Sequence, residues 1–249
     1  MILFVLRRLF ATEPRAVLSS IVRRLRGEVI DTHSTPPEPF DQRYGIDAGG
    51  FIGWRTLHSG QKSDAFNAGY LATFPEDVRS ALSRIVLPHQ YRFVDIGCGK
   101  GRAMIVASEF AFQEIIGVEI SPVLVARGVE NIEIVRARFP ERSPMRVVHS
   151  DAVTFVCPSG PLVLFLAHPF AAPVMRRFVK ALTADLSSRP REAIIIYFNA
   201  KLASLFDEVA MLERTDEVTA DPPSISRYVI WRTRSPRPAI AAATSAKDR

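Results

Sequence analysis

Three closely spaced glycines, Gly97, Gly99 and Gly101, follow an apolar run and precede a helical pattern over residues 100–112. Glycine lacks a Cβ atom, so the backbone of such a turn approaches a ligand closely. The helix that follows directs its unpaired N–H groups into the turn. Glu119 ends the next apolar run, and a carboxylate about twenty residues beyond the glycines suits the two hydroxyl groups of a ribose. Together these features indicate a site for a cofactor that contains adenosine.

The spacing of the glycines separates two cofactor classes. A dinucleotide fingerprint places glycine or alanine three residues after its second glycine, and Arg102 stands at that position. With an aspartate two residues before the first glycine, the pattern Asp-x-Gly-x-Gly-x-Gly resembles motif I of the class I S-adenosylmethionine-dependent methyltransferases. The resemblance implies S-adenosylmethionine as the cofactor, bound by Asp95, Gly97, Cys98, Gly99, Gly101 and Glu119. A tight strand-to-helix turn that binds nothing is the alternative.

Polar residues also end or follow other predicted strands. In open α/β sheets, ligands bind beyond the carboxyl ends of the strands. The polar residues at these ends are Asp95, Glu119, Asp151 and His168. In the resembled family an acid at the position of Asp151 binds the adenine amino group, and Ala152 follows it in the site. An aspartate at a strand end is also common as a turn or N-cap residue, so both roles stay open for Asp151.

His168 lies in the sequence Ala-His-Pro-Phe over residues 167–170, where bacterial relatives that the chain resembles have Asn-Pro-Phe. Histidine therefore replaces the amide that would orient a substrate nitrogen. The ordinary pKa of histidine lies near neutrality, so His168 is a candidate general base. A structural histidine held by hydrogen bonds is the equal alternative.

A second segment precedes the predicted helix over residues 75–87. Its sequence, Gly-Tyr-Leu-Ala-Thr-Phe-Pro, is similar to the Tyr-x-Pro-Thr segment of the seven-stranded protein lysine methyltransferases, with Ala72 in place of the proline. The resemblance implies that Tyr70 and Thr73 cover the methionine end of the cofactor. The alternative is a helix N-cap at Thr73 and a packed tyrosine.

Apolar runs and helical patterns alternate along the chain and predict an α/β fold. The predicted strands lie near residues 91–96, 114–119, 145–150, 161–167, 192–199, 209–213 and 225–233. The predicted helices lie near residues 75–87, 100–112, 122–138, 171–187 and 201–207. Continuous apolar runs are typical of strands buried on both faces, so we expect a doubly wound, mostly parallel sheet. The resemblance adds that the sheet has seven strands and ends in a C-terminal antiparallel hairpin.

The chain divides into four predicted parts. Residues 1–39 form a basic, amphipathic, helical N-terminal extension that ends in a turn-rich linker. Residues 40–90 form a cap segment over the cofactor site, with an irregular surface loop up to about residue 61. Residues 91–233 form the methyltransferase core that the resemblance implies. Residues 234–249 are rich in Pro, Ala and Ser and are expected to be a disordered tail.

Basic charge is concentrated at the two ends of the chain. Residues 1–26 carry six Arg and one Glu, and residues 232–249 carry four Arg, one Lys and one Asp, in a protein of net charge +6. This placement argues against a phosphate-binding groove in the core, so nucleic acid is not an expected partner. The apolar part of the N-terminal segment is too short to span a bilayer. Its arginines follow the apolar residues, whereas a secretory signal has its positive charges before them. We expect a cytoplasmic protein whose residues 1–26 either lie on a membrane surface or pack on the domain or a partner.

The leading hypothesis is methyl transfer to a protein side chain, with lysine as one candidate, or to a small molecule. A non-catalytic binding or scaffold protein that keeps the cofactor fold is a rival, supported by histidine in place of asparagine. A nicotinamide-dependent oxidoreductase is disfavoured by Arg102. No metal site is expected, because the histidines at 33, 58, 89, 149 and 168 are dispersed.

Overall fold

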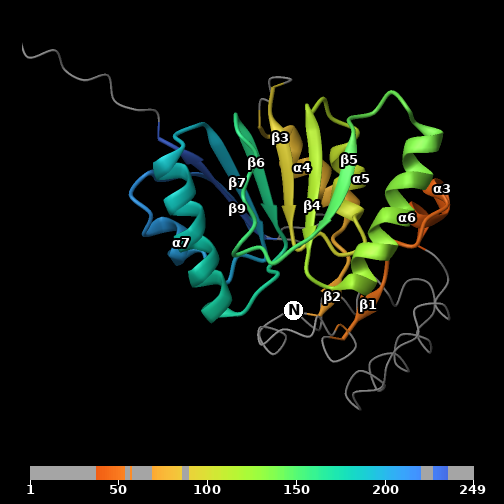
Figure 1. Cartoon of the computed structure of the whole chain (residues 1–249), viewed down its shortest axis with the longest axis horizontal. Helices are drawn as coiled ribbons and strands as arrows, with labels where there is room; N and C mark the ends of the chain where they lie inside the picture. Colours follow the sequence, from red (N-terminus) through yellow and green to blue (C-terminus); the bar gives the residue numbers. More distant parts are fainter. Residues whose placement is uncertain (1–37, 54–56, 58–68, 86–89, 220–226, 235–249) are drawn as a thin grey trace, which may run out of the picture.

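The computed structural model of the chain describes residues 38–53, 57, 69–85, 90–219 and 227–234. The amphipathic helices predicted within residues 1–26, and the tail from residue 235 onward, lie outside the described residues. The part that is described forms a seven-stranded sheet with helices against both of its faces, together with a small two-stranded sheet (Figure 1).

Seven strands form the large sheet in the order β5-β4-β3-β6-β7-β9-β8. Their bounds are Arg92–Ile96 for β3, Glu114–Glu119 for β4, Met145–His149 for β5, Leu162–Leu166 for β6, Ala193–Phe198 for β7, Leu212–Val218 for β8 and Tyr228–Thr233 for β9. The pairs from β5 through β7 are all parallel, whereas β9 pairs antiparallel with both β7 and β8. The doubly wound, mostly parallel sheet and its C-terminal antiparallel hairpin are therefore confirmed.

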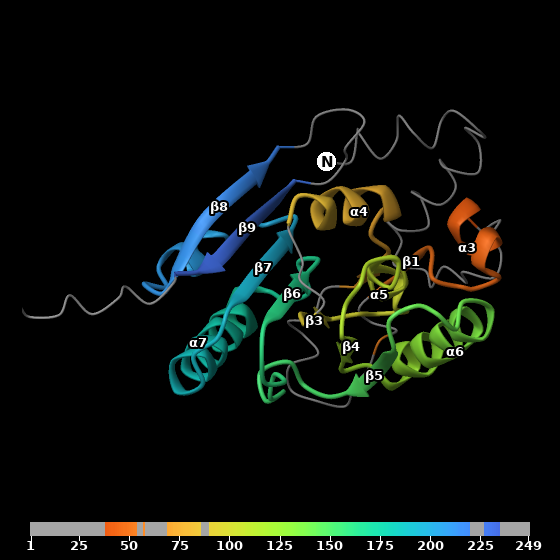
Figure 2. The ribbon, with the colours of Figure 1, turned by 90° about the horizontal axis from the view of Figure 1, so that it is seen from above.

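Helices cover both faces of this sheet, as Figure 2 shows from above. On one face lie α4 (Pro75–Ser83), α5 (Arg102–Ala107) and α6 (Pro122–Arg138), and on the other α7 (Ala172–Ser188) and α8 (Ser204–Asp207). α4, α6 and α7 each have proline in the first turn, where its missing N–H would have no partner within the helix. None of the described helices is long and apolar enough to cross a bilayer.

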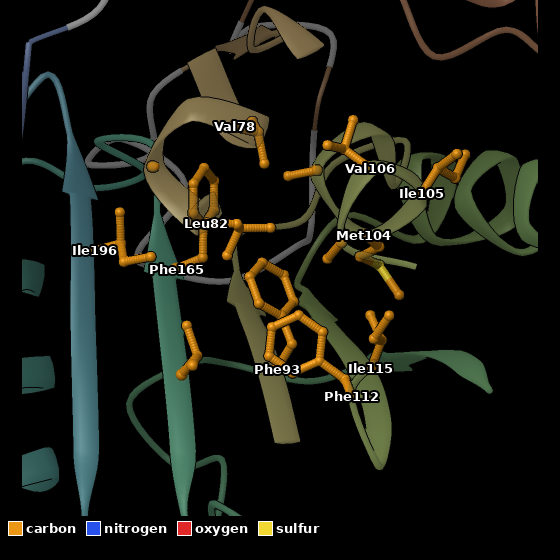
Figure 3. Close-up of a cluster of buried hydrophobic side chains, with 14 of the residues drawn as sticks. Val78, Leu82, Phe93, Met104, Ile105, Val106, Phe112, Ile115, Phe165 and Ile196 are labelled. Carbon is orange, nitrogen blue, oxygen red and sulfur yellow. The ribbon is translucent and has the colours of Figure 1, made fainter. Parts of the chain in front are cut away.

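Each face of the sheet carries its own apolar core. On the face of α4 and α5, the ring of Phe93 contacts those of Phe112 and Phe165, with centroids 5.3 and 5.8 Å apart. Val78 and Leu82 of α4 point into the same cluster (Figure 3). The central strands are buried on both faces because alternate side chains enter the two cores.

Several predicted elements differ in extent. α5 ends at Ala107 instead of residue 112 and begins only after Gly101, whose left-handed φ of 84° is incompatible with a helix. The predicted strand over residues 209–213 was misplaced: β8 covers Leu212–Val218, which is polar because this edge strand exposes most of its side chains. β9 begins at Tyr228, three residues later than expected.

The irregular loop expected from residue 40 contains regular structure. α3 (Pro39–Tyr44) begins inside the predicted linker, and β1 (Phe51–Ile52) pairs with β2 (Tyr70–Leu71). In Figure 1 this small sheet lies below the central strands of the large one. Tyr44 and Ala48 have no exposed surface, so this segment packs on the core.

Candidate functional site

A pocket lies where β3, β4 and β6 end, and β2 forms part of its wall. β3 is the first strand of the large sheet, with β4 on one side and β6 on the other, so the pocket is at the switch point of strand order where open α/β sheets bind ligands. The predicted site residues that line it are Tyr70, Thr73, Asp95, Gly97, Cys98, Gly99, Glu119, Asp151, Ala152 and His168. Gly101 is not part of the lining. Sequence reasoning missed the apolar members of the wall, which include Leu57, Leu71, Leu124, Phe165 and Phe170.

The glycine turn adopts the left-handed backbone for which glycine is suited. Gly97 and Gly99 have φ values of 78° and 55°. A Cβ atom on Gly99 would lie 2.3 Å from Cε2 of Tyr70, and one on Gly97 would lie 2.7 Å from Cβ of Pro169. Because these glycines lack a Cβ atom, Tyr70 and Pro169 can pack against the turn and form two parts of the pocket wall. Gly101 is the N-cap of α5 and faces α6, where its Cβ would lie 3.9 Å from Cα of Gly128.

Glu119 joins the end of β4 to the glycine turn. Its Oε2 accepts a hydrogen bond from the backbone N–H of Gly99 at 2.9 Å, and its Oε1 accepts from Ile120 and Ser121, each at 2.9 Å. Burial raises the pKa of Glu119, and these three N–H groups oppose the rise. The side chain is held in one orientation with its charge inside the pocket.

Asp95 is a second buried acid in the same wall. It is 3% exposed, and burial, followed by the charge of Glu119, raises its pKa to about 8. A carboxyl group with this pKa is largely protonated at neutral pH. It ionises readily if a cation enters the pocket, because the cation stabilises the carboxylate.

Asp151 lines the pocket and also makes a turn. Its Oδ1 accepts a hydrogen bond from the N–H of Val153 at 2.8 Å, which is the bond of an Asx turn. The turn role that was left open for Asp151 is thus present. It places both Asp151 and the buried Ala152 in the pocket wall.

His168 has a left-handed backbone, with a φ of 52°, which is uncommon outside glycine. Its Nδ1 lies 2.5 Å from the hydroxyl oxygen of Tyr197 on β7, and the two rings are stacked with centroids 5.9 Å apart. Burial and then the charge of Lys201 lower the pKa of His168, so the imidazole is neutral at physiological pH.

Tyr70 stands over the glycine turn. Its hydroxyl donates to the carbonyl oxygen of Ala48 at 2.5 Å, and burial raises its pKa well above the ordinary value. Thr73 lines the pocket, but the N-cap of α4 is Phe74 and no side chain caps it. The alternative of an N-cap at Thr73 is therefore wrong.

Two buried cations beside the glycine turn hold the cap segment, and the sequence analysis did not foresee this role. Arg102 is 2% exposed and pairs with Glu38 at 2.6 Å and Asp41 at 2.9 Å. Lys100, also 2% exposed, pairs with Asp47 at 2.7 Å. The sequence signal was the presence of two basic residues in a glycine turn between an apolar strand and an apolar helix.

A smaller polar cluster completes this docking. Asn131 of α6 donates to the carbonyl oxygens of Asp47 and Lys100 at 2.8 and 3.0 Å. Asp41 accepts from the N–H groups of Ala48 and Gly49. These bonds fix the segment around Ala48 to α5 and α6. The carbonyl oxygen of Ala48 is the partner of the Tyr70 hydroxyl.

No protein-family model and no curated protein matches this chain. Among solved structures, the chain is similar to yhhF from Escherichia coli, described as a candidate methyltransferase, with 17% identity, a TM-score of 0.50, and coverage of 65% of this chain and 86% of the other. The chain has the class I methyltransferase fold. The chain is also similar to magnesium protoporphyrin IX methyltransferase from Synechocystis PCC 6803, which was solved with bound S-adenosylmethionine. The alignment covers 64% of this chain and 79% of the other, with 14% identity and a TM-score of 0.49.

Within this fold the pocket has oxygen acceptors of a kind that fits S-adenosylmethionine. The cofactor carries an ammonium and a sulfonium, a ribose diol and an adenine amino group, all of which favour oxygen acceptors. Asp95, Glu119 and Asp151 provide carboxylic oxygens along the lining, and Leu124 and Phe170 provide apolar surface for a base. Among the residues that the structure describes, no group of His, Cys, Asp and Glu could hold a metal ion.

Proposed function

We propose that the protein is an S-adenosylmethionine-dependent methyltransferase. The observation that carries this proposal is the meeting of three acids, Asp95, Glu119 and Asp151, around a glycine turn at the switch point of the sheet. A cofactor with a sulfonium and a free ammonium gains more from this concentration of carboxyl groups than an anionic cofactor does. When bound, S-adenosylmethionine supplies a methyl group on a positively charged sulfur, which is an electrophile.

The residues of the pocket would divide the work of binding between them. Glu119 accepts hydrogen bonds from the ribose hydroxyls, and Asp151 accepts one from the adenine amino group. Asp95 neutralises positive charge at the amino-acid end of the cofactor. Tyr70 and Thr73 cover that end and exclude water, which strengthens every charge interaction beneath them.

The acceptor would enter at the end of the pocket where His168 stands, on the loop that follows β6. Methyl transfer needs the nucleophile and the methyl carbon in line and at near-contact distance, and orientation alone contributes about 7–11 kcal/mol. The acceptor is a protein side chain, with lysine as one candidate, or a small molecule. A cytoplasmic location and a membrane contact through residues 1–26 remain predictions.

Calorimetric titration of the purified chain with S-adenosylmethionine, S-adenosylhomocysteine and NAD tests the proposal. We expect micromolar dissociation constants for the first two and no heat of binding with NAD. Arg102 supports the expected lack of NAD binding. It stands where a dinucleotide site has its third glycine, and it is buried and paired with Glu38 and Asp41. Absence of binding by either sulfur compound would favour the non-catalytic scaffold.

A further inference from the structure

The pair formed by His168 and Tyr197 determines which proton the imidazole presents to the pocket. Nδ1 of His168 faces the Tyr197 hydroxyl at 2.5 Å, so Nε2 is the nitrogen left for a ligand. A neutral imidazole has one N–H donor and one acceptor nitrogen. The state of Nε2 therefore follows from whether Nδ1 donates to the tyrosine or accepts from it.

The surroundings of the Tyr197 hydroxyl decide this question. Tyr197 is fully buried, and burial raises its pKa to about 12, so the hydroxyl keeps its proton at neutral pH. The nearby backbone N–H of Leu202 opposes that rise. The protonated hydroxyl has one proton to donate, and within the described part of the chain His168 Nδ1 is the acceptor in reach. Nδ1 therefore accepts, and the imidazole proton is on Nε2.

A positive charge also acts on His168 from a residue outside the pocket lining. Lys201 follows β7 on the neighbouring loop, and its charge acts on His168. Both the Nε2–H dipole and this ammonium attract a negatively charged oxygen. An amine acceptor gains nothing here, because a donor directed at its lone pair would block the electrons that must attack.

Resting on the proposed function, we propose that His168 is a hydrogen-bond donor in the acceptor site and that the methyl acceptor is a carboxylate. One carboxylate oxygen accepts from Nε2–H, and the other oxygen is free to attack. Tyr197 is a positioning residue that acts through His168 by fixing the tautomer. The candidate role of His168 as general base does not fit this arrangement.

The reaction is balanced without a base. A lone pair of the carboxylate oxygen forms the new O–C bond to the methyl carbon. The S–C bond breaks, and its electron pair stays on sulfur, giving a thioether and a methyl ester. No proton is transferred, and the opposite charges of carboxylate and sulfonium cancel, which a water-poor pocket favours.

The tautomer is tested by nitrogen NMR on the full-length protein with ¹⁵N-labelled histidine, recorded at neutral pH. The variant H168N, whose asparagine tolerates the left-handed backbone, identifies the His168 signals by their loss. We expect an unprotonated, hydrogen-bonded Nδ1 and a protonated Nε2. In Y197F we expect the two tautomers to become mixed while the fold is kept. A protonated Nδ1 in the parent protein overturns the inference.

The acceptor class is tested with matched probes and methyl-labelled S-adenosylmethionine. Benzoate, phenylacetate and a glutamate-containing peptide are compared with benzylamine, phenethylamine and a lysine-containing peptide. We expect label only in the acid set, in a product that releases methanol on mild alkaline treatment, and at least a tenfold loss in H168A. Label in the amine set, or in neither set, overturns the inference.

These outcomes are distinct from failure of the proposed function. If the protein binds no S-adenosylmethionine in the calorimeter, the proposed function fails at the cofactor. If it binds the cofactor but methylates amines, or has the other tautomer, only the assignment of His168 and the carboxylate fails.

Discussion

At the scale of single residues, Gly99 allows the wall of the pocket to be tested apart from its charges. The change Gly99→Ala adds a Cβ atom 2.3 Å from Cε2 of Tyr70 at a backbone φ of 55°. Tyr70 must then leave the turn, so we expect cofactor affinity to fall at least tenfold, about 1.4 kcal/mol. The left-handed backbone adds a loss of stability of roughly 1–2 kcal/mol. Calorimetry and urea denaturation measure the two effects.

Two further variants separate the clash from the backbone strain. The double variant G99A/Y70A removes the clash. We therefore expect its free energy of unfolding to lie below that of Y70A by no more than the cost of the backbone strain. Gly53→Ala is the matched control, because among the residues that the structure describes its Cβ would meet nothing closer than 4.0 Å. Equal loss of affinity in G53A and G99A would contradict the role given to Tyr70 as a wall.

Glu119 tests the charges at the same scale. In Glu119→Gln the amide keeps the shape, but its NH₂ group must face a backbone N–H of Gly99, Ile120 or Ser121 that now has no acceptor. We expect a loss of about 1–3 kcal/mol in the free energy of unfolding and at least a tenfold weaker cofactor affinity. Urea denaturation and calorimetry give the two numbers. An unchanged dissociation constant in the folded variant would remove Glu119 from the cofactor site.

At the scale of elements, α3 is joined to α5 by a buried ion pair. The change Arg102→Met leaves Asp41, which is 4% exposed, without its guanidinium. Removing one partner of a buried pair costs about 3–5 kcal/mol, so we expect a loss of that size in urea denaturation. Arg84→Ala breaks the more exposed pair with Asp216 and should cost less than about 1 kcal/mol. Similar losses in the two variants would mean that Arg102 does not hold the cap segment.

The same elements show why part of the structure could be read from the sequence. β6 and β7 are continuous apolar runs between turns, and such runs identify buried strands by composition alone. The pocket followed from topology, because parallel strands bring their carboxyl ends together wherever the intervening chain goes. Most of the predicted site residues therefore meet in one pocket.

Other elements carry no local signal. β8 is an edge strand whose side chains are mostly exposed, so its sequence has the polarity of a loop. α3 is stabilised by Arg102, which is 61 residues away from Asp41 in the chain. The tautomer of His168 likewise depends on Tyr197, a residue of another strand. Contacts of this kind arise from tertiary packing, and periodicity along one segment does not encode them.

At the scale of the whole molecule, the buried acid Asp95 links stability to pH and to the cofactor. Its pKa is about 8 in the folded chain, against 3.8 for the ordinary carboxyl. The folded state therefore binds more protons than the unfolded state between these two values, and stability falls as pH rises through that window. We expect a slope of up to about 1.4 kcal/mol per pH unit from this group. Asp95→Asn, which cannot ionise, should lack that part of the slope when urea denaturation is compared between pH 5 and pH 9.

The same linkage predicts that cofactor binding releases protons. S-adenosylmethionine carries an ammonium and a sulfonium, so binding that brings these positive groups near Asp95 favours its ionised form and lowers the pKa of that group. At pH 7, where Asp95 is mostly protonated, binding should release a substantial fraction of one proton. Calorimetry in two buffers of different ionisation enthalpy measures that fraction directly. Asp95→Asn should bind the cofactor more weakly and release fewer protons. Equal proton release by both proteins would assign the titration to another group, such as Glu119, whose charge acts on Asp95.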